Sequence, residues 1–332
     1  MDYIVDMNGV NVEYQLKKGA ILAVNDVSLK IMKGKMTALV GESGSGKTTL
    51  ATTILNCLTP PGKLVGGEIT FMNNGEPIRI DKLSEGQLNK FRWEKVSMVF
   101  QAAQSSLNPV MTVRDSFLET YHAHFPKAKK EDIIKKASEL LAYVKLDVNR
   151  VLASFPHELS GGMKQRVMIA FSLLLDPDFV ILDEPTTALD VITQDYIFRI
   201  LKEINREMGV TMLLMTHDIN VVGKFSDYVG VMYAGRIMEY GATQEVFTRH
   251  IHPYTEGLIR ATPSLKRELS RMQSIPGNPP NMRMLTQGCP FAERCAWRID
   301  DCEKELPDWE QYSEESGCRC IRMRERAEGR KE

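Results

Sequence analysis

The segment Gly41-Glu42-Ser43-Gly44-Ser45-Gly46-Lys47-Thr48 decides the fold, because it matches the pattern G-x-x-x-x-G-K-[ST] in full. An apolar run, residues 36–40, precedes it, and a helical pattern through Leu58 follows it. This order predicts a buried strand, a glycine-rich loop and a helix. The glycines let successive N–H groups turn inward, and the start of the helix directs its positive end to the same place. The segment therefore predicts a phosphate-binding loop, in which Lys47 reaches the β- and γ-phosphates of a nucleotide and Thr48 ligates Mg²⁺.

A second run supports a nucleotide-hydrolysing site. The stretch Phe179-Val180-Ile181-Leu182 is purely apolar and ends in two carboxylates, Asp183 and Glu184. Asp183 at the end of such a strand is suited to hold Mg²⁺, and Glu184 is suited to orient or deprotonate the attacking water. Alone this pattern is weak, since many strands end at a solvated acidic loop, but downstream of a complete phosphate-binding loop it predicts an ATPase.

Composition narrows the class of protein. The chain has 332 residues, of which 43% are hydrophobic and 26% charged, so it is neither disordered, coiled coil nor collagen. Forty-two basic residues against 43 acidic ones leave a net charge of -1, which gives no electrostatic footprint for nucleic acid. The acidic start, MDYIVDMNGV, is unlike a signal peptide, and no apolar run reaches the length of a membrane span. We therefore expect a cytoplasmic protein that would serve a membrane only as a peripheral subunit.

Apolar patterns and composition divide the chain into regions. Short apolar runs in residues 2–31 predict strands joined by a turn at Lys17-Lys18-Gly19, and residues 112–165 are mostly helical, with an apolar face over 128–145. The runs at 179–182 and 210–215 predict buried parallel strands with a helix over about 192–208 between them. After His250 prolines and cysteines accumulate, and the charged end 321–332 predicts a frayed tail. We therefore predict an ATPase domain at 1–245, with helices inserted at about 105–165, and an accessory domain at 246–332.

The sequence Leu159-Ser160-Gly161-Gly162-Met163-Lys164-Gln165-Arg166 identifies the family of the ATPase. Its simplest interpretation is a helix N-cap at Ser160 with a helix beginning near Met163. Some twenty residues before the Asp-Glu pair, however, it resembles the signature motif of ATP-binding cassette (ABC) ATPases. The resemblance implies an α/β P-loop NTPase (RecA-like) cassette with an inserted helical subdomain. It also implies a head-to-tail dimer, in which the signature Ser and Gly N–H groups contact the γ-phosphate held on the partner.

The resemblance extends to further positions. It implies that Gln101 is the Q-loop glutamine sensing Mg²⁺ and γ-phosphate, that Ala188-Leu189-Asp190 is the D-loop at the dimer interface, and that His217 is the switch histidine. Tyr14 is placed like the aromatic residue that stacks on adenine, although a plain strand residue is its alternative. The implied catalytic residues are Lys47, Gln101, Glu184 and His217, and the implied Mg²⁺ ligands are Thr48, Gln101 and Asp183. The implied nucleotide contacts are Tyr14, Gly41, Ser43, Gly44, Ser45, Gly46, Lys47, Thr48, Thr49, Gln101, Ser160, Gly161, Gly162 and Asp190.

Other segments resemble the dipeptide and oligopeptide importer branch of this family. They are residues 106–113 (SLNPVMTV), 252–255 (HPYT), 275–280 (IPGNPP) and 288–295 (GCPFAERC). The resemblance implies an ATPase subunit at the cytoplasmic face of the membrane, paired with itself or with a sibling ATPase. Its other partners would be two transmembrane permeases and, indirectly, an external substrate-binding protein. Members of the branch also carry nickel or oligosaccharides, so the cargo stays open.

The six cysteines form one isolated residue and one cluster. Cys57, on the helix predicted after the loop, is expected to be core filler. The cluster Cys289, Cys295, Cys302, Cys318 and Cys320 predicts a metal site in a reducing compartment, either zinc or an iron–sulfur cluster, and its wide spacings suit zinc poorly. Disulfides or free thiols are the remaining alternative. The peptide-importer resemblance implies a [4Fe–4S] cluster held by Cys289, Cys295, Cys302 and Cys320, with Cys318 as the alternative fourth ligand. The cluster would staple a small cysteine-rich domain, or report redox or iron status.

Two other functions deserve comparison. A soluble cassette of DNA repair or translation would need a long coiled-coil or zinc-hinge insertion, or two ATPase units, and this chain has one phosphate-binding loop and a modest helical insertion. An iron–sulfur sensor that uses ATP as a switch without transport is the second alternative. Both are less consistent with the motifs than an importer ATPase.

Overall fold

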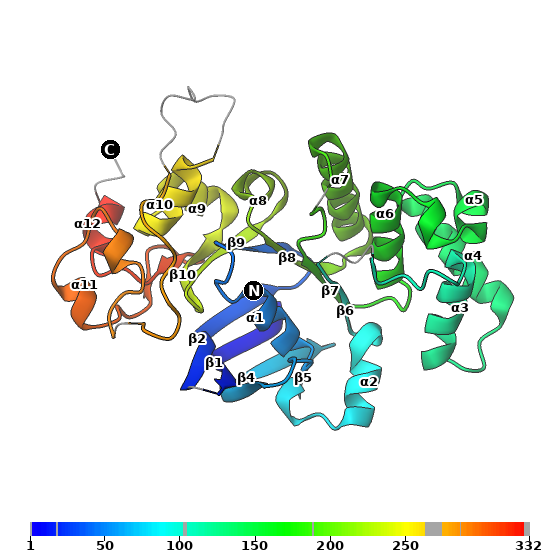
Figure 1. Cartoon of the computed structure of the whole chain (residues 1–332), viewed down its shortest axis with the longest axis horizontal. Coiled ribbons are helices and arrows are strands. Elements are labelled where there is room, and N and C mark those ends of the chain that lie inside the picture. The colour runs from blue at the N-terminus through cyan, green and yellow to red at the C-terminus, as the bar shows by residue number, and fades with distance from the viewer. Residues whose placement is uncertain are drawn as a thin grey trace. The chain divides into compact units, whose positions relative to one another are not determined.

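The computed structural model describes residues 2–17, 19–101, 105–187, 189–262, 274–285 and 287–328. The chain forms two compact units (Figure 1). The first combines residues 1–82 with 215–332, and the second consists of residues 83–214. Among the described residues, no helix combines the length and the hydrophobicity of a transmembrane segment.

An antiparallel sheet begins the first unit. Its strands are ordered β2 (Gly19–Met32), β1 (Tyr3–Leu16), β4 (Gly62–Asn73) and β5 (Glu76–Arg79), followed by the 3₁₀ turn η1 (Ile80–Lys82). Alternate residues of β1, such as Val10 and Val12, are fully buried, as the period of a half-buried strand requires. The predicted strands are confirmed as the antiparallel pair of β1 and β2, in which Leu16 pairs with Gly19; Lys18 of the predicted turn lies outside the described residues.

The phosphate-binding segment lies between β3 (Met36–Val40) and α1 (Lys47–Ile54) of the same unit. All five residues of β3 are buried, and β3 pairs in parallel with β9 (Tyr228–Tyr233), which pairs antiparallel with β10 (Arg236–Ala242). The prediction of a helix through Leu58 was wrong, because α1 ends at Ile54 and Asn56 takes a left-handed φ of 47°. Cys57 is therefore half-buried beyond the helix and is not core filler on it.

Helices and short strands complete the first unit. Helices α8 (Ile219–Phe225), α9 (Thr243–Arg249) and α10 (Pro253–Arg260) are followed by the 3₁₀ turn η5 (Ala292–Arg294) and by α11 (Asp301–Lys304). Strand β12 (Gly317–Cys318) then pairs with β10 and with β11 (Glu310–Gln311). The frayed tail was wrong for residues 323–328, which form α12 (Met323–Glu328) with Arg326 buried; residues 329–332 lie outside the described residues.

The second unit holds the predicted helices. Helix α2 (Glu85–Glu94) and β6 (Val96–Val99) precede α3 (Val113–His124), α4 (Lys130–Tyr143), α5 (Val148–Ala153), η3 (Pro156–Glu158) and α6 (Gly161–Ser172). The apolar face predicted for 128–145 is confirmed, since Ile133, Ala137 and Leu141 of α4 are buried. Strands β6 and β7 (Phe179–Asp183) pair in parallel, and α7 (Val191–Met208) leads to β8 (Thr211–Thr216), whose last two residues belong to the first unit.

Candidate functional site

The glycines of the phosphate-binding loop stand where no side chain fits. A Cβ on Gly41 would lie 2.1 Å from the carbonyl oxygen of Met232, and one on Gly46 would lie 2.4 Å from that of Ala23. Gly46 also takes a φ of 103°, a left-handed conformation that favours glycine. The loop therefore needs glycine for close packing against β2 and β9 as well as for its curvature.

Lys47 closes the curve of this loop. Its ammonium donates to the carbonyl oxygens of Gly41 (2.8 Å) and Glu42 (3.0 Å) and to the hydroxyl of Ser45 (3.2 Å). The side chain is buried, and its residue is the first of α1, with Thr48 and Thr49 following in the first helical turn. This arrangement places a cation and a helix N-terminus on one concave loop, which suits an anionic polyphosphate.

In the second unit, one of the two carboxylates at the end of β7, that of Glu184, lies beside Gln101. Asp183 is the buried last residue of β7, at 2% exposure, and Glu184 follows it with a left-handed φ of 46°. Glu184 Oε2 accepts hydrogen bonds from Gln101 Nε2 (3.1 Å) and from the hydroxyl of Thr187 (3.0 Å). The structure thus brings two predicted site residues, Gln101 and Glu184, into direct contact, and a strained backbone aims the Glu184 side chain. Their catalytic roles stay predictions.

The signature and D-loop residues occur at two helix starts of the second unit. Ser160 is the N-cap of α6 and its hydroxyl accepts from the Met163 N–H (3.4 Å), so α6 begins at Gly161, two residues before the predicted start. Asp190 caps α7, and its two carboxylate oxygens accept from the N–H (3.0 Å) and the hydroxyl (2.6 Å) of Thr193. These bonds from Thr193 lower the pKa of Asp190. Ala188 of the predicted D-loop lies outside the described residues.

His217 and Tyr14 belong to the first unit. His217 is exposed directly after β8, one residue before Asp218, the N-cap of α8. Tyr14 is a half-buried residue of β1, and its ring covers Gly62, where a Cβ would lie 2.8 Å from the ring. The switch role of His217 and the adenine contact of Tyr14 stay predictions.

The sequence analysis missed a group of C-terminal residues that contact the phosphate-binding loop. The guanidinium of Arg294 donates to both carboxylate oxygens of Glu42, at 2.7 and 2.9 Å. The hydroxyl of Tyr254 accepts from the Glu42 N–H at 2.9 Å. The segments quoted for the peptide-importer resemblance contain both Arg294 and Tyr254, but no local pattern connects either residue with Glu42 more than 200 positions earlier.

Four of the clustered cysteines line one small enclosed space in the first unit. Cys289, Cys295, Cys302 and Cys320 surround it together with Phe291 and Trp297, whereas Cys318 lies in β12, opposite Glu239 of β10. All six cysteines of the chain are free thiols, and burial raises the pKa of Cys289 to about 12 and that of Cys320 to about 11. Within the part of the chain that the structure describes, however, no group of three or more His, Cys, Asp or Glu is arranged to hold a metal ion.

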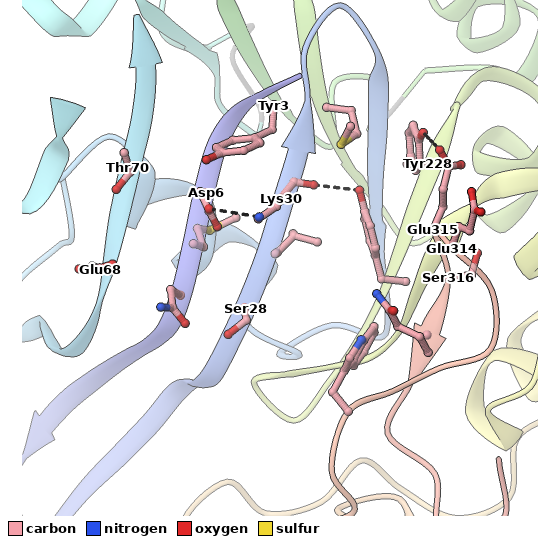
Figure 2. A pocket seen from close by; sticks show the side chains of 18 residues that line it. Tyr3, Asp6, Ser28, Lys30, Glu68, Thr70, Tyr228, Glu314, Glu315 and Ser316 are labelled. Atoms are coloured by element: carbon pink, nitrogen blue, oxygen red, sulfur yellow. Dashed lines mark hydrogen bonds and ion pairs between the residues drawn. The ribbon is translucent and has the colours of Figure 1, made fainter. Parts of the chain in front are cut away.

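A larger cavity of about 630 Å³ lies elsewhere in the first unit (Figure 2). The described residues that line it include the carboxylates of Asp6, Glu68, Glu314 and Glu315 and a single ammonium, that of Lys30, which is 3.6 Å from Asp6. None of the predicted nucleotide contacts lines it. Because a polyphosphate would be repelled by this acidic lining, the cavity is not the nucleotide site.

Comparison with known proteins identifies two matching families. The ABC transporter family matches residues 24–187, and the family described as "Oligopeptide/dipeptide transporter, C-terminal region" matches residues 238–302. Among solved structures, the dimeric ABC transporter cassette MJ0796 is 31% identical, with a TM-score of 0.64 over 72% of this chain and 99% of that one. The same cassette bound to ADP and phosphate gives a TM-score of 0.63. The α/β ABC cassette fold is therefore confirmed.

Curated relatives match nearly the whole chain. A dipeptide transport ATP-binding protein of Caldanaerobacter subterraneus subsp. tengcongensis is 40% identical over 96% of this chain and 97% of its own. An oligopeptide transport ATP-binding protein of Salmonella typhimurium is 41% identical over 92% of this chain and 89% of its own. The chain therefore belongs to the ABC transporter ATPases, and among them to the dipeptide/oligopeptide transporter type.

Proposed function

We propose that this ATPase powers the uptake of dipeptides or oligopeptides through a membrane importer. The observation that carries the proposal is the 40–41% identity to dipeptide and oligopeptide transport ATP-binding proteins over more than nine-tenths of this chain. The ATPase would lie peripherally at the cytoplasmic face of the membrane. It would dimerise with itself or a sibling ATPase and act on two permeases supplied by an external binding protein. The same role in a nickel or oligosaccharide importer is the alternative.

The site residues would divide the work of hydrolysis as follows. The phosphate-binding loop and Lys47 would bind the β- and γ-phosphates, and the oxygens of Thr48 and Asp183 fit the hard-oxygen donor set that Mg²⁺ prefers. Bound Mg²⁺ would neutralise charge on the phosphates. Glu184, aimed by its contact with Gln101, would orient or deprotonate the attacking water, and Gln101 would also complete the Mg²⁺ ligands. His217 and, from the partner subunit, the signature N–H groups after Ser160 would contact the γ-phosphate.

The cargo can be tested with the assembled importer. The ATPase would be reconstituted in vesicles with its two permeases and binding protein, and ATP-dependent uptake of a labelled tripeptide, nickel ion and a trisaccharide would be compared. A vesicle set carrying Glu184→Gln is the matched control for uptake that does not need hydrolysis. Uptake of the tripeptide alone is the expected result. Uptake of nickel or trisaccharide without tripeptide would replace the peptide proposal by its alternative.

We also propose that the C-terminal cysteines hold a [4Fe–4S] cluster. Four thiols around one enclosed space support this assignment, and Cys289, Cys295, Cys302 and Cys320 would be the ligands. The lack of a single-ion arrangement among the described residues is compatible with a cluster, because four irons and four sulfides keep their thiolates farther apart than one zinc ion does. The cluster would serve as a structural staple for a segment that buries little apolar surface of its own.

A pair of serine variants tests this assignment directly. Protein purified without oxygen is expected to contain about four irons and four sulfides per chain and to be brown. Cys320→Ser should lose iron and colour. The matched control is Cys318→Ser, which changes the one C-terminal cysteine that is not a proposed ligand, and it should keep both. Colourless wild-type protein with one zinc would contradict the iron–sulfur proposal. Loss of iron from Cys318→Ser but not from Cys320→Ser would make Cys318 the fourth ligand instead of Cys320.

A further inference from the structure

Within the first unit, an ion pair joins residues 289–320, here called the cysteine segment, to the phosphate-binding loop. The Arg294 guanidinium donates hydrogen bonds to both oxygens of the Glu42 carboxylate, and Glu42 is the second residue of the loop. We propose that Arg294 is a positioning residue for ATP binding. It holds the Glu42 carboxylate on the side of the C-terminal segment and neutralises its charge, so that the loop stays attractive to the nucleotide phosphates.

The geometry leaves Arg294 little freedom. Besides its two bonds to Glu42, it donates through Nε to the carbonyl oxygen of Pro276 (2.8 Å) and through Nη1 to the hydroxyl of Tyr233 (3.1 Å). Its side chain is 7% exposed, against 26% for Glu42. A bidentate arginine–carboxylate pair fixes the orientation of the carboxylate as well as its distance from the guanidinium, and the ammonium of a lysine cannot reproduce this geometry.

Charge explains why the loop needs this partner. The loop binds an anion, so a free carboxylate at Glu42 would repel the phosphates that Lys47 attracts. The hydrogen bonds that Arg294 donates to the Glu42 carboxylate raise the pKa of Arg294, so the guanidinium stays charged. The Glu42 N–H is also engaged, by the Tyr254 hydroxyl, so both the backbone and the side chain of this residue are held by C-terminal residues.

The cysteine segment itself presents the arginine. Arg294 ends the 3₁₀ turn η5, in which its N–H donates to Phe291 (3.0 Å) and the Cys295 N–H donates to Ala292 (3.2 Å). The ring of Phe291 packs against those of Tyr233 and Tyr254, at centroid distances of 5.3 and 5.2 Å. Unfolding of the turn between Cys289 and Cys295 would therefore break the contact between Arg294 and Glu42. If these two cysteines hold the proposed cluster, loss of the cluster would have this effect.

Nucleotide affinity of the full-length protein tests the proposal. The dissociation constant of a fluorescent ATP analogue and the KM for ATP are expected to rise about tenfold or more in Arg294→Gln, as an uncompensated charge near the phosphates requires, while kcat at saturating ATP changes less than about twofold. Arg294→Lys should fall between wild type and Arg294→Gln. Arg298→Gln, which breaks an exposed 3.0 Å pair with Glu303 in the same segment, is the matched control and should bind like wild type.

The double variant separates charge from misfolding. Adding Glu42→Gln to Arg294→Gln removes the uncompensated carboxylate and should restore most of the affinity, although it restores no lost contact. Unchanged affinity in Arg294→Gln, or equally weak binding in the single and double variants, would overturn the proposal. Cys295→Ser tests the consequence for the cluster: weak ATP binding there with normal behaviour of the Arg294 variants would leave the cysteine segment important but refute Arg294 as its connection to the loop.

Discussion

The buried carboxylate of Glu239 allows a stability prediction that tests how the C-terminal residues are fixed to the ATPase. Glu239 lies in β10 with no solvent exposure. It accepts hydrogen bonds from the N–H groups of Ile251 (2.8 Å) and His252 (3.0 Å), just before α10, and from the hydroxyl of Tyr312 (2.9 Å). One side chain therefore connects a strand, a helix start and the C-terminal segment.

The size of the effect follows from these three donors. Glu239→Met fills similar space but leaves three donors without this acceptor, the two buried N–H groups and the partly buried Tyr312 hydroxyl, at about 1–3 kcal/mol each before relaxation. We expect the free energy of unfolding of the first unit to fall by about 3–6 kcal/mol. Glu239→Gln keeps one acceptor oxygen and should cost about 1–3 kcal/mol, and Tyr312→Phe, which removes only one donor, about 1 kcal/mol.

Urea unfolding followed by tryptophan fluorescence measures these values, since two of the three tryptophans, Trp297 and Trp309, lie in the C-terminal segment. The predicted order is Glu239→Met, then Glu239→Gln, then Tyr312→Phe, from largest loss to smallest. A Glu239→Met protein as stable as Tyr312→Phe would refute the reasoning, because it would show that the donors find other partners.

The pH dependence of the same variants gives a second check. Burial raises the pKa of Glu239 above its ordinary value of 4.5. A raised pKa in the folded state means that folding binds a proton, so this contribution is present below pH 4.5 and is lost as the pH rises through the folded-state pKa. The stability of wild type relative to Glu239→Gln should therefore fall as the pH rises above 4.5, and a rise would contradict the assigned direction.

Three substitutions test the nucleotide site. Lys47→Ala removes the ammonium inside the loop and should abolish tight ATP binding in a fluorescent-nucleotide titration; unchanged affinity would count against the loop assignment. Glu184→Gln should lower kcat by about 10²-fold or more and trap an ATP-bound dimer on gel filtration, and wild-type phosphate release would remove the role of Glu184. Gly162→Ala places a Cβ 2.9 Å from Thr193 Cγ2, so it should weaken ATP-dependent dimerisation, measured by sedimentation, while leaving ATP binding by the monomer unchanged.

Local patterns predicted what depends on neighbouring residues. The strand β3, the loop and the start of α1 are encoded in one short segment, and the four buried positions of α4 repeat with helical spacing. The helix end was missed because no glycine or proline marks Ile54, and the chain leaves the helix through a left-handed Asn56. The buried Arg326 was missed because a charged tail gives no sign of the carboxylate it pairs with, Glu256.

Contacts between distant residues could not be predicted in this way. The sequence left Cys318 and Cys320 as alternatives for the fourth ligand, and only the resemblance to the family favoured Cys320. The structure separates them, because Cys318 lies in β12 opposite Glu239, whereas Cys320 follows the end of β12 and lines the same small space as the other three cysteines. Residues two positions apart in a regular strand share a face, so a strand pattern alone could not distinguish them; the end of β12 at Cys318 does.

The predicted domain boundary between residues 245 and 246 likewise gives no indication of the contacts between distant residues that cross it. It was placed where prolines and cysteines begin, which is a change in composition. Polar contacts nevertheless cross it, among them those of Glu42 with Arg294, of Asp26 with Arg319 at 2.7 Å, and of Glu239 with the start of α10. Glu42, Asp26 and Glu239 would lose these contacts if the C-terminal residues shifted, and Glu42 lies in the phosphate-binding loop. The variable positions of a nucleotide-binding motif are thus where an accessory segment can act on ATP affinity without altering any residue that the motif fixes.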